Sequence, residues 1–577
     1  MVKKVNLKSK NLDKIKIKSI EYYLIFVLVI IDIEIFFCNA SFVSNLIKGN
    51  FTSYVFSPAR IFLYIILFIL FVLLKKRIIS NRIEYESNKV YKPLKYLIIT
   101  FIIIIIIISS ILLLRNNINI ISLSIICVII LYLIFLLLFH SNNYKLNVFM
   151  TCFISLIFCI TTDVIHPVDE MIHFTTAYNM AHGNFESKLN YSNKELEKIP
   201  GWGNFNSLSS LQVHYNKDIY LINTKSERWP VSGIKISYIP QTIGIFISEK
   251  LNGTIMDTFY FGRIFNALFL LLGIYILMKL VEYKVNCVFA ILTTPYLLLL
   301  GGTYNVDCFG IITILLFCTY IINIVLDNRK TRIEKKDICI LLILSLLILC
   351  FKTASYFFIF LMYLLLFKKL TKKQKTLAII MLILLTTISI KLMLPNDVNN
   401  IADNRVNNTS FSGQLKFLLS SPLVFIKVYF LHTLNTFFNI NFYQDLNPIY
   451  FFGKYSSYLT LIYFLYLVLI GISESEEKKE LNIKHKITLL IITCLLFYFT
   501  STTMYLGFTP VGEYIIKGYQ ARYIFPFLPL ILMICNNNFI KISNNKNQQL
   551  KIYLVSLTIL LLYTYCCIFS RVLIYFL

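Results

Sequence analysis

Residues 94–114 read LKYLIITFIIIIIIISSILLL, an apolar run long enough to cross a lipid bilayer as one helix. A hydrocarbon core about 30 Å thick needs roughly 20 predominantly apolar residues in a helix. Similar runs recur along the 577 residues, of which 57% are hydrophobic and only 15% charged. This composition excludes an ordinary soluble domain and predicts a multi-pass membrane protein.

Working outward from this run, we expect an all-α polytopic bundle of about fifteen spans, within a range of about 13 to 16. The expected spans lie near residues 20–38, 59–74, 94–114, 118–140, 147–165, 261–281, 286–302, 307–327, 338–351, 354–367, 376–394, 455–472, 487–505, 519–535 and 552–573. The first four spans form an N-terminal extension over residues 1–146. Residues 147–400 form a central module, and residues 401–577 contain a further loop and the last spans.

The formal charge of +26 arises largely from short basic clusters between apolar runs, such as those at 75–77, 329–336 and 368–375. By the positive-inside rule these clusters mark cytoplasmic loops, so nucleic-acid binding is not predicted. The opposite side then carries three long loops, at 166–260, 395–454 and 506–518. We expect an integral plasma-membrane protein whose functional loop, 166–260, is extracytoplasmic.

The stretch HPVDEMIHF at residues 166–174 follows the fifth expected span directly. Its adjacent carboxylates, Asp169 and Glu170, can serve as a general base and can contact a sugar or a divalent ion. A proline followed by acidic residues is also how many helices begin, because negative charge is favoured at the helix N-terminus. Both interpretations are open. The spacing after it predicts a short helix that ends at Gly183.

Several cations are expected at the outer ends of spans, against the positive-inside bias. Arg263 opens the sixth span, Lys352 lies between the ninth and tenth, and Arg522 opens the fourteenth together with Gln520. Arginine and lysine can hold a phosphate group and stabilise it as it leaves, although each cation alone can also snorkel to ordinary lipid headgroups. Tyr304 and Asp307 are expected at the same side.

The long loop 166–260 contains four of the seven histidines and both tryptophans, Trp202 and Trp229, which either recognise a ligand or anchor the loop at the headgroups. Within it, residues 233–251 predict a helix on the membrane surface or dipping into it. No metal site is assigned: His166 and His173 flank the carboxylates, but loop histidines are usually solvated, and a divalent cation stays open as a cofactor. Asp32 and Glu34 within the first span can form a proton relay or pair with neighbouring helices.

Taken in order, the motifs resemble a known family. They are Asp169-Glu170-x-x-His173-Phe174-x-x-Ala177, then Tyr238-x-Pro240-Gln241-x-x-Gly244, Arg263-x-x-Asn266, Tyr304-x-x-Asp307, Lys352-x-x-x-Tyr356, and Gly518-Tyr519-Gln520-Ala521-Arg522-Tyr523-x-x-Pro526. This order over residues 147–573 resembles domain-of-unknown-function family 2142, a bacterial family of predicted membrane proteins. It is also similar to the wider GT-C glycosyltransferases.

The resemblance implies a GT-C-like bundle whose first outer loop carries juxtamembrane helices and the catalytic residues. It implies Asp169 as the base and Glu170 as its helper or metal contact. Donor phosphate would be bound by Arg522, Gln520, Lys352 and Arg263, and substrate by His173, Tyr304, Asp307, Trp202, Trp229, Tyr238 and Gln241. We expect these acidic and basic residues to gather around one external cavity.

The function so implied is the inverting transfer of a sugar from a polyprenyl-phosphate donor to a cell-envelope glycan or lipid acceptor, with membrane lipids as the surrounding partners. Two alternatives are open. A transporter or flippase of lipid-linked glycan would use Asp32 and Glu34 within the membrane. A surface-polysaccharide polymerase or ligase would also use a large outer loop and arginine, but would not require Asp169 and Glu170.

Overall fold

The computed structural model describes residues 144–162, 169–183, 235–351, 356–393, 408–420, 422–439, 455–474, 481–535 and 552–561, with a few isolated residues elsewhere. Within these ranges all regular elements are helices, which confirms the prediction of an all-α fold for this part of the chain. Among the described residues, three helices are long and apolar enough to cross a membrane: Ile255–Leu280 (α10), Asp307–Leu326 (α13) and Ile483–Phe508 (α19). They match the spans expected at 261–281, 307–327 and 487–505. The total number of spans and the N-terminal extension stay predictions.

The chain divides into two compact units, each described here by itself. The first comprises residues 1–231, 241–267 and 564–577, and the second comprises residues 232–240 and 268–563. This division differs from the three-part organisation expected from the sequence, which stays a prediction.

The first unit contains Tyr144–Cys152 (α6), Ile154–Thr161 (α7), Glu170–Ala181 (α8), most of Ile239–Lys250 (α9) and the first half of α10. An apolar contact joins α8 to α10, where the rings of Phe174 and Phe259 lie 4.9 Å apart. Helix α9 approaches α10 closely at Gly244, where an added Cβ would lie 2.5 Å from the carbonyl oxygen of Phe261. Only glycine permits this approach.

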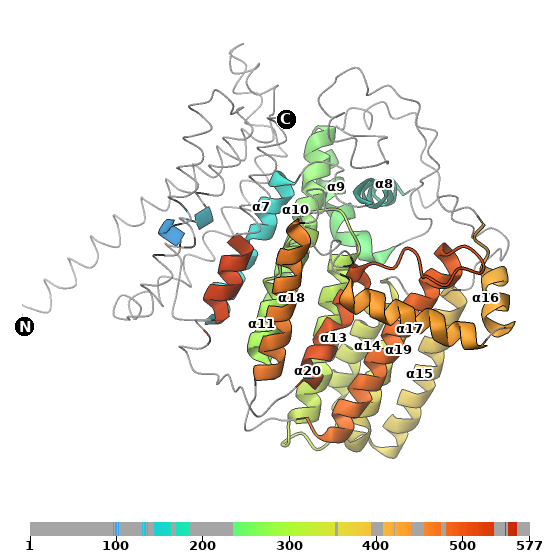
Figure 1. The fold of residues 1–577 in the computed structure, drawn as a ribbon. Coiled ribbons are helices and arrows are strands. Elements are labelled where there is room, and N and C mark those ends of the chain that lie inside the picture. Colours follow the sequence, from blue (N-terminus) through green and yellow to red (C-terminus); the bar gives the residue numbers. More distant parts are fainter. Residues whose placement is uncertain are drawn as a thin grey trace, which may run out of the picture. The chain divides into compact units, whose positions relative to one another are not determined.

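The second unit is a bundle of helices and 3-10 segments. Beyond α13 and α19 it contains Ile236–Tyr238 (η5), Val285–Leu292 (α11), Pro295–Gly301 (α12), Lys335–Leu349 (α14), Phe357–Lys369 (η6), Lys372–Met393 (α15), Phe411–Ser420 (α16), Pro422–Phe438 (α17), Tyr455–Ser473 (α18), Ala521–Tyr523 (η9), Phe525–Phe527 (η10) and Leu528–Ile534 (α20). Helices α13, α14, α15 and α19 run in roughly the same direction in Figure 1, with η6 in contact with α13, α15 and α19, and α17 lies across α19.

Basic loops that were expected on one side do meet in this unit. The backbone N–H of Ile333 donates to the carbonyl of Lys369 at 3.2 Å. The ammonium of Lys369 in turn donates to the carbonyl of Asp327 at 2.7 Å. The loop between α13 and α14 therefore lies against the end of η6, as the charge pattern indicates.

Two expected spans differ in form. The run 286–302 is broken into α11 and α12, because Thr294 caps a new helix whose first residue is Pro295. The described part of the expected span 354–367 belongs to a 3-10 helix, η6, whose 13 residues make it unusually long. Side-chain contacts anchor it: the hydroxyl of Tyr363 lies 2.8 Å from that of Ser345 on α14.

The prediction of one outer loop at 395–454 is wrong for much of its described part, which is helical. Residues 411–438 form α16 and α17, which together are apolar enough to span a membrane but bend by 110° at their junction. The polar residues on both sides of this stretch conceal its apolar content when the loop is read as one segment.

Candidate functional site

A buried ion pair fixes the beginning of α8. The Nε of Arg263 on α10 donates to Oε1 of Glu170 at 2.8 Å, and Nη2 donates to Oε2 at 2.6 Å. Both side chains are fully buried. Such a two-pronged contact is the strongest geometry available to arginine and a carboxylate, and it sets orientation as well as distance.

The same guanidinium closes the end of α7. Its Nη1 donates to the carbonyls of Cys159 at 2.9 Å and Thr162 at 2.7 Å. These groups belong to the last turn of α7, where carbonyls lack helical partners and positive charge is favoured. Arg263 therefore ties the end of one helix to the start of the next.

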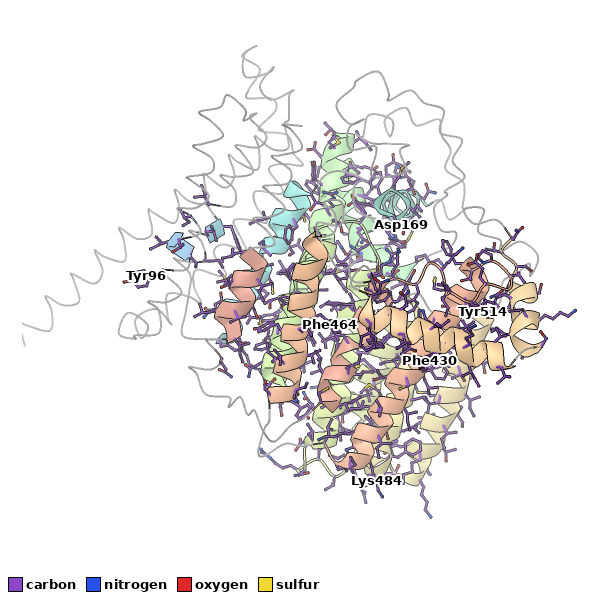
Figure 2. All side chains as sticks on the ribbon, viewed as in Figure 1. Tyr96, Asp169, Phe430, Phe464, Lys484 and Tyr514 are labelled. Atoms are coloured by element: carbon purple, nitrogen blue, oxygen red, sulfur yellow. The ribbon has the colours of Figure 1, made fainter. Side chains whose placement is uncertain are left out.

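Asp169 is held differently from its neighbour. It occupies the N-cap of α8 in the left-handed region, with φ 62°, and its side chain makes no capping bond. This conformation is uncommon for a residue other than glycine and costs on the order of 1 to 3 kcal/mol, which the surrounding structure must offset. The neighbouring Glu170–Arg263 pair supplies such a restraint. Asp169 lies at the start of α8 in Figure 2, half-buried, whereas Glu170 is fully buried.

The rest of α8 follows the sequence prediction. His173 lies half-buried in its first turn, where its N–H donates to the carbonyl of Asp169 at 3.1 Å. Gly183 terminates the helix two residues after Ala181. Its φ is 68°, and its N–H donates to the carbonyl of Met180, as is common for a glycine that follows a helix. Near this end, His182 lies 3.4 Å from Glu249 of α9.

Other expected substrate contacts in this unit are more buried than a ligand-binding role suggests. Gln241 on α9 has no exposed surface. Trp202, Trp229 and His166 lie outside the described residues. Among the residues that the structure does describe, no group of three or more His, Cys, Asp and Glu is placed to hold a metal ion.

A second polar cluster lies in the other unit. Asp307, buried in the first turn of α13, has Oδ2 4.0 Å from Nη1 of Arg522 on η9. The side chain of Arg522 is 15% exposed, and its guanidinium lies 5.6 Å from the ring centroid of Tyr523. This is a loose ion pair beside an accessible cation, in contrast to the closed pair of Arg263.

Neighbouring side chains support that cluster. The hydroxyl of Tyr356 donates to the carbonyl of Tyr523 at 3.0 Å. Tyr304 is fully buried, and Tyr238 on η5 is nearly so. The side-chain oxygen of Gln520 is buried and accepts no hydrogen bond from the described residues. Lys352 lies in a gap between described residues, so its predicted phosphate contact stays a prediction.

The sequence did not single out His432 on α17. Its Nε2 lies 2.8 Å from the hydroxyl of Ser501, and its ring meets the ring of Tyr519 edge-on at 4.7 Å. Tyr519 directly precedes Gln520, so α17 packs against the segment that carries Arg522. The feature of the sequence that could have indicated His432 is a single histidine within the apolar stretch of α17.

The geometry thus brings together two of the expected groups. Glu170 meets Arg263 in one unit, and Asp307 meets Arg522 in the other. Because Arg263 is enclosed by protein acceptors, its contacts favour a positioning role over the phosphate contact that was expected. Asp169 and Arg522 belong to different units, so the expectation that they share one cavity stays a prediction.

Comparison with known proteins gives one match. Residues 152–531 match the family model described as Predicted membrane protein (DUF2142). A search of curated proteins found no match, and neither did a search of solved structures. Since the match covers more than half of the sequence, the chain belongs to the DUF2142 family of predicted membrane proteins.

Proposed function

We propose that this chain is an inverting membrane glycosyltransferase at the outer face of the plasma membrane. It moves a sugar from a polyprenyl-phosphate donor to a hydroxyl of a cell-envelope glycan or lipid. The observation that carries the proposal is the division of labour between two adjacent carboxylates. Glu170 forms a buried ion pair with Arg263, whereas Asp169 is half-buried at the N-cap of α8 in a left-handed conformation.

In the proposed reaction Asp169 is the general base. The acceptor hydroxyl transfers its proton to the Asp169 carboxylate as its oxygen forms a bond to the anomeric carbon. The bond from that carbon to the phosphate oxygen breaks, its electron pair leaves with the polyprenyl phosphate, and the configuration inverts. The N-terminus of α8 favours negative charge at Asp169, and the ionised carboxylate is the form that can accept a proton.

The leaving phosphate needs a cation, and Arg522 is the candidate that the contacts favour. It is partly exposed and its contact with Asp307 is at the limit of an ion pair. Exchanging a loose carboxylate contact for a phosphate costs less than breaking a closed pair such as that of Arg263. Gln520 can contribute the N–H groups of its side-chain amide as donors to the phosphate oxygens.

The test uses the purified full chain in lipid nanodiscs. The probes are radiolabelled monosaccharides linked to decaprenyl phosphate, supplied as a panel of sugars with an envelope glycan and lipid extract as acceptor. The readouts are free decaprenyl phosphate and labelled product. Asp169→Asn keeps the size and polarity of the side chain but removes the base, so we expect a loss of about 10²- to 10⁴-fold in kcat.

Glu170→Gln serves as the matched control. It changes the adjacent carboxylate and should lower the amount of folded protein more than the rate per folded molecule. A wild-type rate for Asp169→Asn would refute the role of the base. The flippase would be favoured if no donor released decaprenyl phosphate and if labelled lipid crossed the bilayer only when Asp32 and Glu34 were intact.

A further inference from the structure

Helix α17 carries polar side chains on its buried face and mostly apolar ones on its exposed face. The buried stripe comprises Val428, Tyr429, His432 and Thr436. The exposed face comprises Leu423, Ile426, Phe430, Leu434, Phe437 and Phe438, together with two exposed polar side chains, Asn435 and Lys427. The ammonium of Lys427 lies 5.0 Å from the ring centroid of Tyr514, which a long lysine side chain permits at the edge of an apolar surface. A surface helix in water places its apolar side chains inward, so this distribution is typical of a helix with an apolar medium outside it.

The buried stripe is fixed to α19 by specific hydrogen bonds. The hydroxyl of Tyr429 lies 2.5 Å from that of Thr502, and His432 bonds to Ser501. These contacts determine which face of α17 turns outward. Phe430, labelled on α17 in Figure 2, is 63% exposed, whereas His432 is 5% exposed.

Helix α16 is pinned to the turn that follows α19. The side-chain oxygen of Gln414 accepts from the N–H of Gly512 at 3.0 Å. The N–H of Val511 donates to the carbonyl of Asn408 at 3.0 Å. With one helix held at the turn and the other held across α19, the 110° bend is part of the fold. The pair therefore cannot straighten into one membrane span without losing these contacts.

The depth of α17 follows from the position of its contacts along α19. Ser501 precedes the end of α19, Phe508, by seven residues, which is about 10 Å at 1.5 Å per residue. A hydrocarbon core is about 30 Å thick, so this crossing point lies within one leaflet and not at the aqueous surface. The exposed face of α17 also adjoins the exposed side of the candidate span α19, because the hydroxyl of Thr433 lies 3.4 Å from that of Tyr498, which is 41% exposed.

We propose that α16 and α17 form a membrane-embedded hairpin whose exposed apolar face is covered by the acyl chains of one bilayer leaflet. The hairpin is a wall between those chains and the segment from Tyr519 to Tyr523, which His432 contacts from the inner side. This inference does not rest on the proposed transferase activity.

The test is site-specific fluorescence quenching in nanodiscs of phosphatidylcholine, some carrying bromine at a defined chain position. The background is the full chain with Trp202→Phe and Trp229→Phe, and each probe is a single new tryptophan. Phe430→Trp reports on the hairpin, and Ile426→Trp, on the same stripe, replaces it if the first variant does not fold. Helical circular dichroism and gel filtration select folded protein.

Two control positions bracket the result. Ile491→Trp lies on the exposed side of the candidate span α19, and Asn328→Trp lies in the exposed turn between α13 and α14. We expect Phe430→Trp to be quenched by mid-chain bromine at least half as strongly as Ile491→Trp, and to resist aqueous iodide. Asn328→Trp should show the reverse pattern.

Two outcomes would overturn the proposal. Strong iodide quenching of Phe430→Trp without bromine quenching would place the stripe in water, as an ordinary outer loop requires. Protection from both quenchers in discs that contain a single copy of the chain would mean that another part of the chain covers the stripe. A third outcome would support the proposal. If bromine quenches Phe430→Trp only in discs that hold a single copy of the chain, lipid covers the stripe there, and a second copy covers it in more crowded discs.

Discussion

Replacing Arg263 with methionine removes the guanidinium that joins α7, α8 and α10. The change leaves the Glu170 carboxylate buried without its two charge-assisted hydrogen bonds. Removing one partner of a buried pair typically costs about 3 to 5 kcal/mol. The carbonyls of Cys159 and Thr162 also lose a donor, and each buried group left unsatisfied adds about 1 to 3 kcal/mol.

The magnitudes predict an order among variants. Glu170→Gln leaves Arg263 with its two carbonyl partners, so it should lower the free energy of unfolding by about 3 to 5 kcal/mol. Arg263→Met should lower the free energy of unfolding by more, about 5 kcal/mol or above, because the carbonyls at the end of α7 also lose their hydrogen-bond donor. The double variant Glu170→Leu with Arg263→Met removes both charges, and should be no less stable than Arg263→Met alone.

The assay is unfolding in mixed micelles with increasing SDS, followed by circular dichroism. It compares Glu170→Gln, the single variants Glu170→Leu and Arg263→Met, and the double variant of these last two. The double-mutant cycle reports the interaction energy directly, provided that each single change adds no new contact. Additive losses in the double variant would refute the reasoning, because they would show that Glu170 and Arg263 act independently. A loss below about 1 kcal/mol for Glu170→Gln would do the same, since it is typical of exposed pairs.

Three further changes test the packing of the described helices. Gly244→Ala should lower stability by about 1 to 3 kcal/mol because its Cβ meets backbone at 2.5 Å, whereas Gly507→Ala, with no heavy atom within 4 Å, should be neutral or stabilising; melting of both variants gives the comparison. Tyr356→Phe should cost about 1 kcal/mol through loss of one hydrogen bond to Tyr523, measured by SDS unfolding, and an unchanged midpoint would argue against that bond. Lys284→Met should cost about 3 to 5 kcal/mol because its buried ammonium donates to carbonyls at the ends of α18 and α20; resistance to proteolysis equal to wild type would contradict this.

Hydropathy predicted the elements whose structure depends on local composition. Long apolar runs gave α10, α13 and α19, and the spacing before Gly183 gave the extent of α8. These features depend on residues close together in the sequence, where bilayer thickness and helix-stop chemistry act directly. The left-handed conformation of Asp169 was not expected from its type.

Features that depend on distant contacts were not predictable. Glu170 and Arg263 are 93 residues apart, and nothing local shows that the arginine is enclosed. The sequence predicts a loop at 395–454 because polar residues on both sides conceal the apolar stretch of α16 and α17. The buried polar stripe of α17 can be recognised only where it bonds to α19. His432 belongs to that stripe, so its packing against Tyr519 could be recognised only once both helices were placed.

The most direct test of the catalytic assignment compares Asp169→Asn with Glu170→Gln in the same nanodisc preparation, with sugar transfer divided by the amount of folded protein. We expect Asp169→Asn to fold like the wild type and to transfer sugar at least about 100-fold more slowly, whereas Glu170→Gln should lose stability rather than rate per folded molecule. If Asp169→Asn transferred at the wild-type rate per folded molecule, Asp169 would not be the base.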